Sequence, residues 1–138
     1  MLAKAAALLE VGEDPEQTVT LCDRALACDP DAEYEAWAYE LKVDALMAGG
    51  RLEQALRTAE RGVRAAPERA PLHARRASVL YEMGRFREAE EPIEEALRRD
   101  PDDAFALHLR ARIRQRLGRT EAAERDFRRA AELAPEEY

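Results

Sequence analysis

The chain has 138 residues, of which 46% are hydrophobic, 37% are charged and only 6% are aromatic, and its formal net charge is −7. This composition excludes a disordered chain, and the length favours one domain over two. The negative net charge argues against a general nucleic-acid-binding protein, which needs a basic surface. No apolar stretch approaches the length of a membrane span.

The first expected helix covers residues 2–11 and superficially resembles a short signal peptide. Its apolar stretch is too short for one, and it meets Glu10 and Gly12 without a convincing cleavage context. We therefore expect a cytoplasmic location. Lys4 and Lys42 are the only lysines among many arginines, which favours a GC-rich bacterial genome.

The second expected helix covers residues 15–28 and begins with a recognisable cap. Asp14 is a good N-cap residue, and Pro15 suits the first helical position. Cys22 and Cys28 lie six residues apart, so they project in different directions and suit neither a disulfide nor a metal pair. We expect both to be small apolar residues of a reduced core.

The remaining helices follow from a repeat that runs through the chain. A glycine recurs at spacings of 38, 34 and 34 residues and a proline at 37, 34 and 34, at Gly12, Gly50, Gly84 and Gly118 and at Pro30, Pro67, Pro101 and Pro135. A period of 34 is typical of stacked helical hairpins. The glycine marks a turn with positive φ and the proline ends the second helix. The expected helices are 33–48, 52–65, 70–83, 86–99, 103–117 and 120–133, and Pro92 should kink the sixth helix on its solvent side.

These residues resemble the tetratricopeptide repeat family over essentially the whole chain. The third copy shows the pattern best, with Ala77, Leu80, Tyr81, Gly84, Phe86, Ala89, Ile93, Ala96, Leu97 and Pro101. The resemblance implies an all-α, right-handed superhelical solenoid of about eight antiparallel helices. It implies a single domain, 1–138, with repeats at about 1–30, 31–67, 68–101 and 102–135. It also implies a non-enzymatic scaffold that binds a protein or peptide partner and needs no cofactor.

In this family the first helix of each repeat lines a concave groove. Positions counted back from each turn glycine predict an acidic section of the groove at Glu40 and Asp44, beside Trp37 and Met47. They predict a basic section on the last repeat, which Arg75 lies close enough to join. The candidate groove residues are Trp37, Glu40, Asp44, Met47, Ser78, Tyr81, Phe105, His108, Arg112 and Arg116. We expect Trp37, Tyr81 and Phe105 to anchor a partner and Arg112 and Arg116 to meet its acidic groups.

One family-specific ligand does not match these residues. Members that bind chaperones clamp a terminal carboxylate with lysines and asparagines. The corresponding positions here hold Leu2, Ala6, Glu40, Asp44, Ala74 and Ser78. Recognition of a chaperone C-terminus is therefore not expected.

A basic residue stands eight positions before every turn glycine, at Lys4, Lys42, Arg76 and Arg110. This basic ladder is either an anion-binding track or a structural set that pairs with carboxylates on adjacent helices, and the second interpretation is favoured. The last repeat differs further, because Arg114 replaces Leu8, Leu46 and Leu80.

The last helix offers an alternative function. No following helix covers Phe127, Ala130 and Leu133, and the family often adds a final solvating helix. The chain is then either part of a longer protein or docks here onto another molecule, such as a second copy. The alternative is therefore a structural assembly module that forms homo-oligomers through its C-terminal end.

No catalytic or metal-binding motif is found, and we expect neither an enzyme nor a metal site. His73 and His108 lie 35 residues apart and therefore on adjacent first helices. No third ligand accompanies them, so a zinc site is not favoured.

Overall fold

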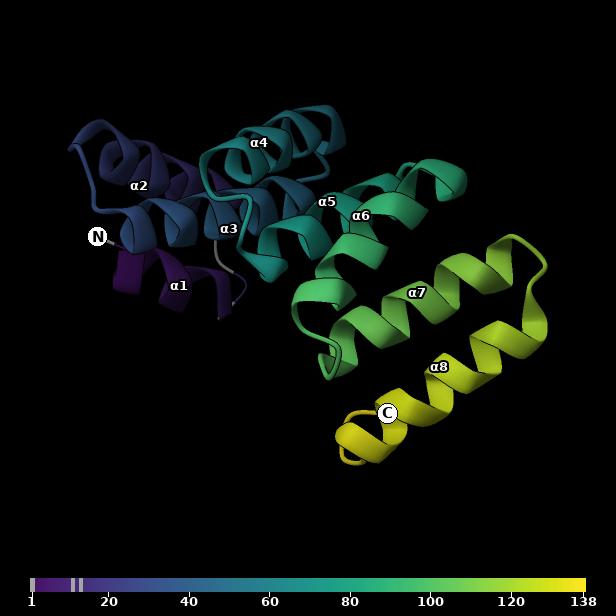
Figure 1. Ribbon diagram of the computed structural model, residues 1–138. Helices are drawn as coiled ribbons and strands as arrows, with labels where there is room; N and C mark the ends of the chain where they lie inside the picture. The colour runs from purple at the N-terminus through teal and green to yellow at the C-terminus, as the bar shows by residue number, and fades with distance from the viewer. Residues whose placement is uncertain (1, 11, 13) are drawn as a thin grey trace.

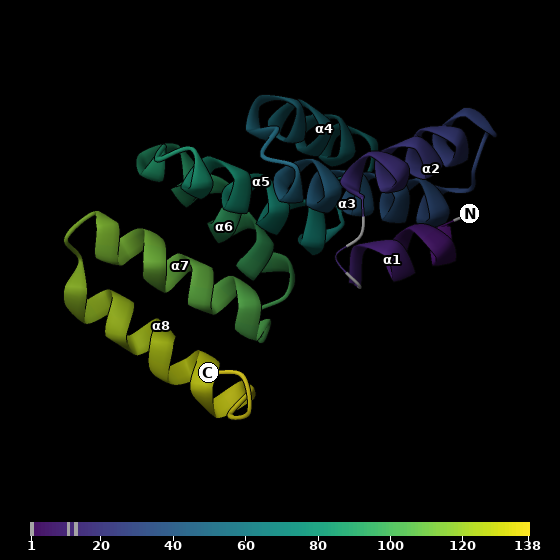
Figure 2. The same ribbon diagram turned by 180° about the vertical axis from the view of Figure 1, so that it is seen from behind.

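The computed structural model describes residues 2–10, 12 and 14–138, and this part of the chain contains eight helices and no strands. The helices follow one another in antiparallel pairs, and the two termini lie at opposite ends of the array (Figures 1 and 2). No helix of the described part is long and apolar enough to cross a membrane. The helices are α1 (Leu2–Glu10), α2 (Pro15–Ala27), α3 (Ala32–Ala48), α4 (Leu52–Ala65), α5 (Ala70–Glu82), α6 (Phe86–Arg99), α7 (Ala104–Arg116) and α8 (Thr120–Leu133).

The odd-numbered helices form the inner layer of the array. Cα atoms of α1 and α3, of α3 and α5, and of α5 and α7 approach within 8 Å. No pair of successive even-numbered helices comes as close within the described residues. The layer with the closer helices is the inner side of a curved stack, so α3, α5 and α7 present the concave surface. The predicted all-α solenoid is confirmed.

One hydrogen-bond pattern at the turn glycine ends the first helix of the second, third and fourth pairs. Gly12, Gly50, Gly84 and Gly118 have φ between 69° and 79°. After α3, the N–H of Gly50 donates to the carbonyl of Met47 and the N–H of Arg51 donates to that of Leu46. The same two bonds recur after α5 and α7, as in a Schellman motif. The first helix of each of these pairs therefore ends at a regular interval, because the turn that follows requires a glycine with positive φ and the repeat supplies one.

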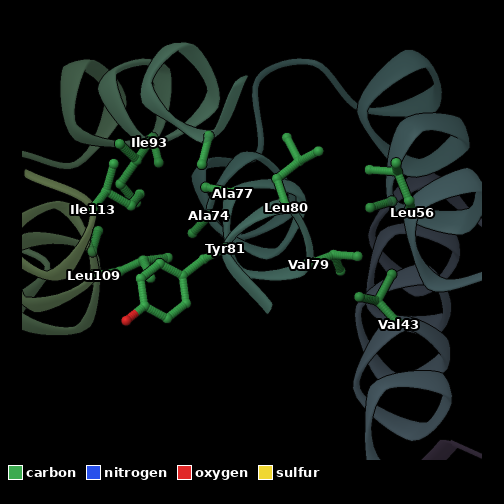
Figure 3. Packing of buried hydrophobic residues seen from close by; sticks show 14 of the residues in the cluster. Val43, Leu56, Ala74, Ala77, Val79, Leu80, Tyr81, Ile93, Leu109 and Ile113 are labelled. Carbon is green, nitrogen blue, oxygen red and sulfur yellow. The ribbon is translucent and has the colours of Figure 1, made fainter. Parts of the chain in front are cut away.

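The largest group of buried apolar residues joins the helices from α3 to α8. Its members come mainly from the faces between helix pairs, and Figure 3 shows Ile93 of α6 close to Ile113 of α7. Tyr81 lies beside Leu109 at the edge of the cluster, with its hydroxyl directed away from the isoleucines (Figure 3). A second cluster around Leu2, Cys22 and other residues packs α1 into the fold, so the apolar N-terminal stretch belongs to the repeat array.

Two local expectations are wrong. Pro92 is buried rather than on the solvent side of α6, because it lies on the face that packs into the core. Cys28 is exposed at the end of α2, whereas Cys22 is fully buried as expected. Burial raises the pKa of the Cys22 thiol from 9.0 to about 12, with Asp23 adding to the effect.

Gly62 of α4 packs closely against both α3 and α5, and its replacement tests this packing. A Cβ at Gly62 would lie 2.9 Å from Leu72 Cδ2 and 3.1 Å from Tyr39 Cβ. We expect Gly62→Ala to lower the free energy of unfolding by about 1 kcal/mol, because overpacking outweighs the better helix propensity of alanine. Urea unfolding measures this change.

Gly49→Ala is the matched control, because the nearest neighbour of a Cβ there, the Ala45 carbonyl oxygen, would lie 3.6 Å away and φ is −84°. Its effect should range from neutral to a gain of about 1 kcal/mol. Equal losses in the two variants would contradict the close packing inferred at Gly62.

Candidate functional site

The concave surface contains a hollow of about 390 Å³ between α5, the start of α7 and the second half of α3. Four of the predicted groove residues, Asp44, Met47, Ser78 and Phe105, line it. The remaining lining residues are Pro71, Ala74, Arg75 and Asp103. The register of the repeat therefore brings side chains from three separate helices to one site.

An exposed apolar row follows one offset of the repeat. Trp37 and Phe105 stand thirteen residues before their turn glycines and are 37% and 50% exposed. Pro71 occupies the same offset between them and lines the hollow. Pro71 is not among the predicted groove residues, although its thirteen-residue offset is the signal that identifies it. Large exposed apolar side chains are uncommon on this chain, and Trp37, Phe105 and Tyr138 are the three observed in its described part.

The predicted acidic section is neutralised by arginines of the next helix pair. Glu40 is buried, and both of its oxygens accept hydrogen bonds from Arg69. Asp44 accepts two bonds from Arg75, at 3.0 and 2.9 Å. Arg75 thus belongs to the acidic section and not to the basic one. This section offers little uncompensated negative charge to a partner.

The predicted basic section has a different environment, because its arginines rest on aromatic rings. The guanidinium carbon of Arg112 lies 4.7 Å from the centre of the Tyr81 ring. That of Arg116 lies 5.9 Å from Tyr81 and 5.4 Å from Phe86. Neither arginine forms an ion pair within the described part of the chain. Both are exposed, so two positive charges face the groove with a fixed aromatic support.

Tyr81 therefore has a supporting role rather than the predicted anchoring one. It is only 8% exposed and packs edge-on against Phe86, with ring centres 5.3 Å apart. A partner at this point would meet the arginines above the ring. Phe86 was not predicted for the groove because its offset, two residues after the glycine, places it in the second helix.

His108 packs against the end of the chain instead of standing open beside the arginines. Its ring stacks on Tyr138 at 4.5 Å and meets Phe127 edge-on at 5.2 Å. Burial lowers the pKa of His108 below its ordinary value of 6.5, and the positive charge of Arg112 lowers it further. The side chain is therefore neutral at pH 7 and adds no charge to the basic section.

The lowered pKa of His108 predicts how stability changes with pH. The unfolded chain takes up a proton near pH 6.5, more readily than the folded chain does. The free energy of unfolding should therefore fall as the pH drops below 6.5, and the loss is complete below the folded-state pKa. His108→Phe should remove this component, which urea unfolding at pH 7.5 and 5.5 would measure. Identical pH dependence in the two proteins would contradict the assigned environment.

The basic ladder has a structural role at two of its four positions. Lys42 pairs with Asp23 of α2 at 2.7 Å, and Arg110 pairs with Glu94 of α6 at 3.2 Å. Asp23 lies in the first repeat and Glu94 in the third, so Lys42 and Arg110 each join their own repeat to the one before it. Arg76 keeps a buried Nε without a hydrogen-bond partner in the described part of the chain. The structural interpretation is confirmed for Lys42 and Arg110.

Arg114 differs from the leucines of the other repeats because it belongs to a charged cluster. It contacts Asp126 at 2.8 Å and Glu94 at 3.4 Å, while Arg110 donates two hydrogen bonds of 2.8 Å to the same Asp126. Asp126 is only 5% exposed. The equivalent positions in the second repeat are Leu46 and Thr58, so the arginine and the aspartate replace an uncharged pair together.

The apolar residues at the C-terminal end are better covered than the sequence suggested. Ala130 is fully buried, and Phe127 and Leu133 are partly buried. The other histidine, His73, lies within 2.7 Å of the Pro67 carbonyl through Nε2. Across the described residues, no group of three or more histidine, cysteine or acidic side chains is placed to hold a metal ion.

Comparison with known proteins agrees with the helical-repeat fold. Two tetratricopeptide repeat models match, one at residues 46–113 and one at 104–137. No curated protein matches the chain.

Solved structures show the same architecture. The second repeat domain of Spaghetti (RPAP3), bound to the HSP90 peptide SRMEEVD, is 26% identical with a TM-score of 0.68, and the match covers 71% of this chain and 91% of that one. The first such domain of human RPAP3 is 26% identical with a TM-score of 0.70, over 72% and 79%. A MamA structure is 18% identical with a TM-score of 0.78, over 99% and 77%, and supports the fold alone.

Proposed function

Because the chain belongs to the tetratricopeptide repeat family, whose domains are protein–protein interaction modules, we propose that it is a non-enzymatic scaffold that binds a peptide or protein segment in the concave groove. The observation that carries this proposal is the hollow between α3, α5 and α7, with Phe105 exposed on its rim. The four helix pairs would act as one domain. An exposed aromatic beside a concave, partly apolar site is the usual setting of a binding hot spot.

The RPAP3 domain supports peptide binding in general, because it is bound to an HSP90 peptide. The ligand is not carried over to this chain. Glu40 and Asp44 stand where the family's chaperone-binding members have clamp residues, and Arg69 and Arg75 already occupy both carboxylates. The proposed partner is therefore not a chaperone C-terminus.

The test begins with selection of peptides from a displayed random library against the 138-residue protein. Phe105→Ala and Trp37→Ala should each weaken binding of the selected peptides, Phe105→Ala by about tenfold or more because hot-spot truncations cost about 2 kcal/mol. Arg57→Ala and Arg61→Ala, two exposed residues of α4 in the outer layer, are the matched controls. Unchanged binding by the groove variants, with loss in the α4 variants, would exclude the groove.

A second proposal is self-association through the C-terminal end. Its support is the position of Tyr138, which is 38% exposed and stacks on His108, the ring that also meets the partly buried Phe127. Sedimentation equilibrium over a wide concentration range tests this proposal, with Tyr138→Ser expected to weaken the dimer. A wild-type protein that stays monomeric at every concentration would remove it.

We also propose a bacterial, cytoplasmic setting for the protein. The scarcity of lysine relative to arginine supports the first part. The free thiols of Cys22 and Cys28 suit a reducing compartment. Cell fractionation of the source organism would test the location, and recovery from a secreted or periplasmic fraction would contradict it.

A further inference from the structure

We infer that the groove recognises a two-part motif, an acidic side chain at Arg112 and Arg116 and an apolar side chain in the hollow beside Phe105, three residues apart in an extended segment. This inference rests on the proposed function and specifies the partner's chemistry.

The acidic half of the motif follows from charge pairing within the groove. Glu40 and Asp44 are bound by Arg69 and Arg75, whereas Arg112 and Arg116 have no carboxylate partner among the described residues. The uncompensated charge on this stretch of α7 is therefore positive, although the whole chain carries −7. A carboxylate between two guanidinium groups forms charge-assisted hydrogen bonds.

The aromatic support makes this arginine pair more than a charged surface. The guanidinium carbons of Arg112 and Arg116 lie 4.7–5.9 Å from the ring centres of Tyr81 and Phe86. Arginines that rest on aromatic rings have lost part of their side-chain freedom before the partner arrives, so binding costs less entropy. Neither guanidinium group donates to a carboxylate of the described residues, so both keep donors for a partner.

The apolar half of the motif follows from the lining of the hollow. Met47, Pro71, Ala74 and Phe105 provide apolar surface, and Asp44 and Arg75 satisfy each other at its rim. Asp103 is occupied as the N-cap of α7, where its carboxylate accepts from the N–H of Phe105. A volume of about 390 Å³ is large enough for a side chain such as leucine.

The spacing follows from helix geometry. Phe105 and Arg112 are seven residues apart on α7, so they share one face and lie about 10.5 Å apart along the helix axis. A polyproline II segment advances about 3.1 Å per residue and returns a side chain to the same face every third residue. Three residues therefore span about 9 Å with both side chains facing α7.

The probes are 14-residue Gly/Ser peptides, acetylated and amidated, that carry one Glu and one Leu separated in sequence by one to seven positions, in both orders. Isothermal titration calorimetry should show the tightest binding at a separation of three in one order. Replacing Glu by Lys should cost about tenfold or more, because a charge-assisted bond contributes about 1.5–3 kcal/mol. A maximum at seven, as for a helical ligand, or no dependence on separation would overturn the inference.

A charge exchange separates recognition from structural damage. Arg112→Glu/Arg116→Glu should bind the Lys peptide more tightly than the Glu peptide, the reverse of the wild type. Arg57→Glu/Arg61→Glu makes the same change at the same spacing on α4 and should keep the wild-type preference. Peptides that need Phe105 but ignore both charge and spacing would refute the motif and leave the groove function standing. Binding that never depends on Phe105 or Trp37 would refute the groove function itself.

Discussion

Asp126→Ala should lower the free energy of unfolding by about 3 kcal/mol, more than any other single charge removal. The reason is that two partly buried arginines lose their buried carboxylate partner. Arg110 and Arg114 are each about one-fifth exposed, and only the more open Glu94 would remain to pair with them. Guanidinium chloride would screen this interaction, so urea unfolding followed by circular dichroism is the appropriate measurement.

Two further variants show whether the loss comes from stranded charge. Arg114→Leu/Asp126→Thr copies the second repeat, where Leu46 and Thr58 occupy these positions beside Lys42, and should recover much of the lost stability. Asp102→Asn removes an exposed carboxylate that pairs with Arg129 and should cost less than about 1 kcal/mol. A double variant as unstable as Asp126→Ala would show that the charged cluster itself, and not an unpaired charge, provides the stability.

Ile113→Ala should lower the free energy of unfolding by about 2–5 kcal/mol, because it opens a cavity at the junction of α6 and α7. Ile113 is fully buried and lies close to Ile93 of the preceding pair (Figure 3). Ile113→Val is the graded control and should cost about 0.5–1.5 kcal/mol.

The solenoid architecture adds a spatial expectation to this variant. Each helix pair contacts only its neighbours, so damage at one junction should loosen the pair beyond it. Hydrogen exchange in Ile113→Ala should therefore rise first in α7 and α8, while α3 and α4 keep their protection. A uniform rise along the whole chain would show a single cooperative unit rather than stacked pairs.

The helix boundaries could be predicted from the sequence because local chemistry determines them. Gly50, Gly84 and Gly118 provide the positive φ of the turn, and Asp14 caps α2 by accepting from the N–H of Glu16. The groove residues could be placed on one surface for a related reason. Offsets of three and four residues keep a side chain on one helix face whatever its neighbours are.

The pairing of side chains inside the groove could not be predicted in the same way. Register places Glu40 and Asp44 on the concave face, but whether they are free depends on how far Arg69 and Arg75 reach from the next pair. Tyr81 shares that face with Phe105, yet the longer side chain of Arg112 covers it. These contacts depend on how far a side chain reaches across the junction between two helices. The period of the repeat gives only the positions of residues along the chain, so it does not predict them.

One measurement tests the central claim, that the concave layer holds the partner. Amide and methyl NMR spectra of the labelled protein would be recorded with and without the tightest selected peptide. We expect the largest chemical-shift changes in α3, α5 and α7, with Met47, Ser78 and Phe105 among the most affected residues. Changes that concentrate instead on α4, α6 and α8 would contradict it.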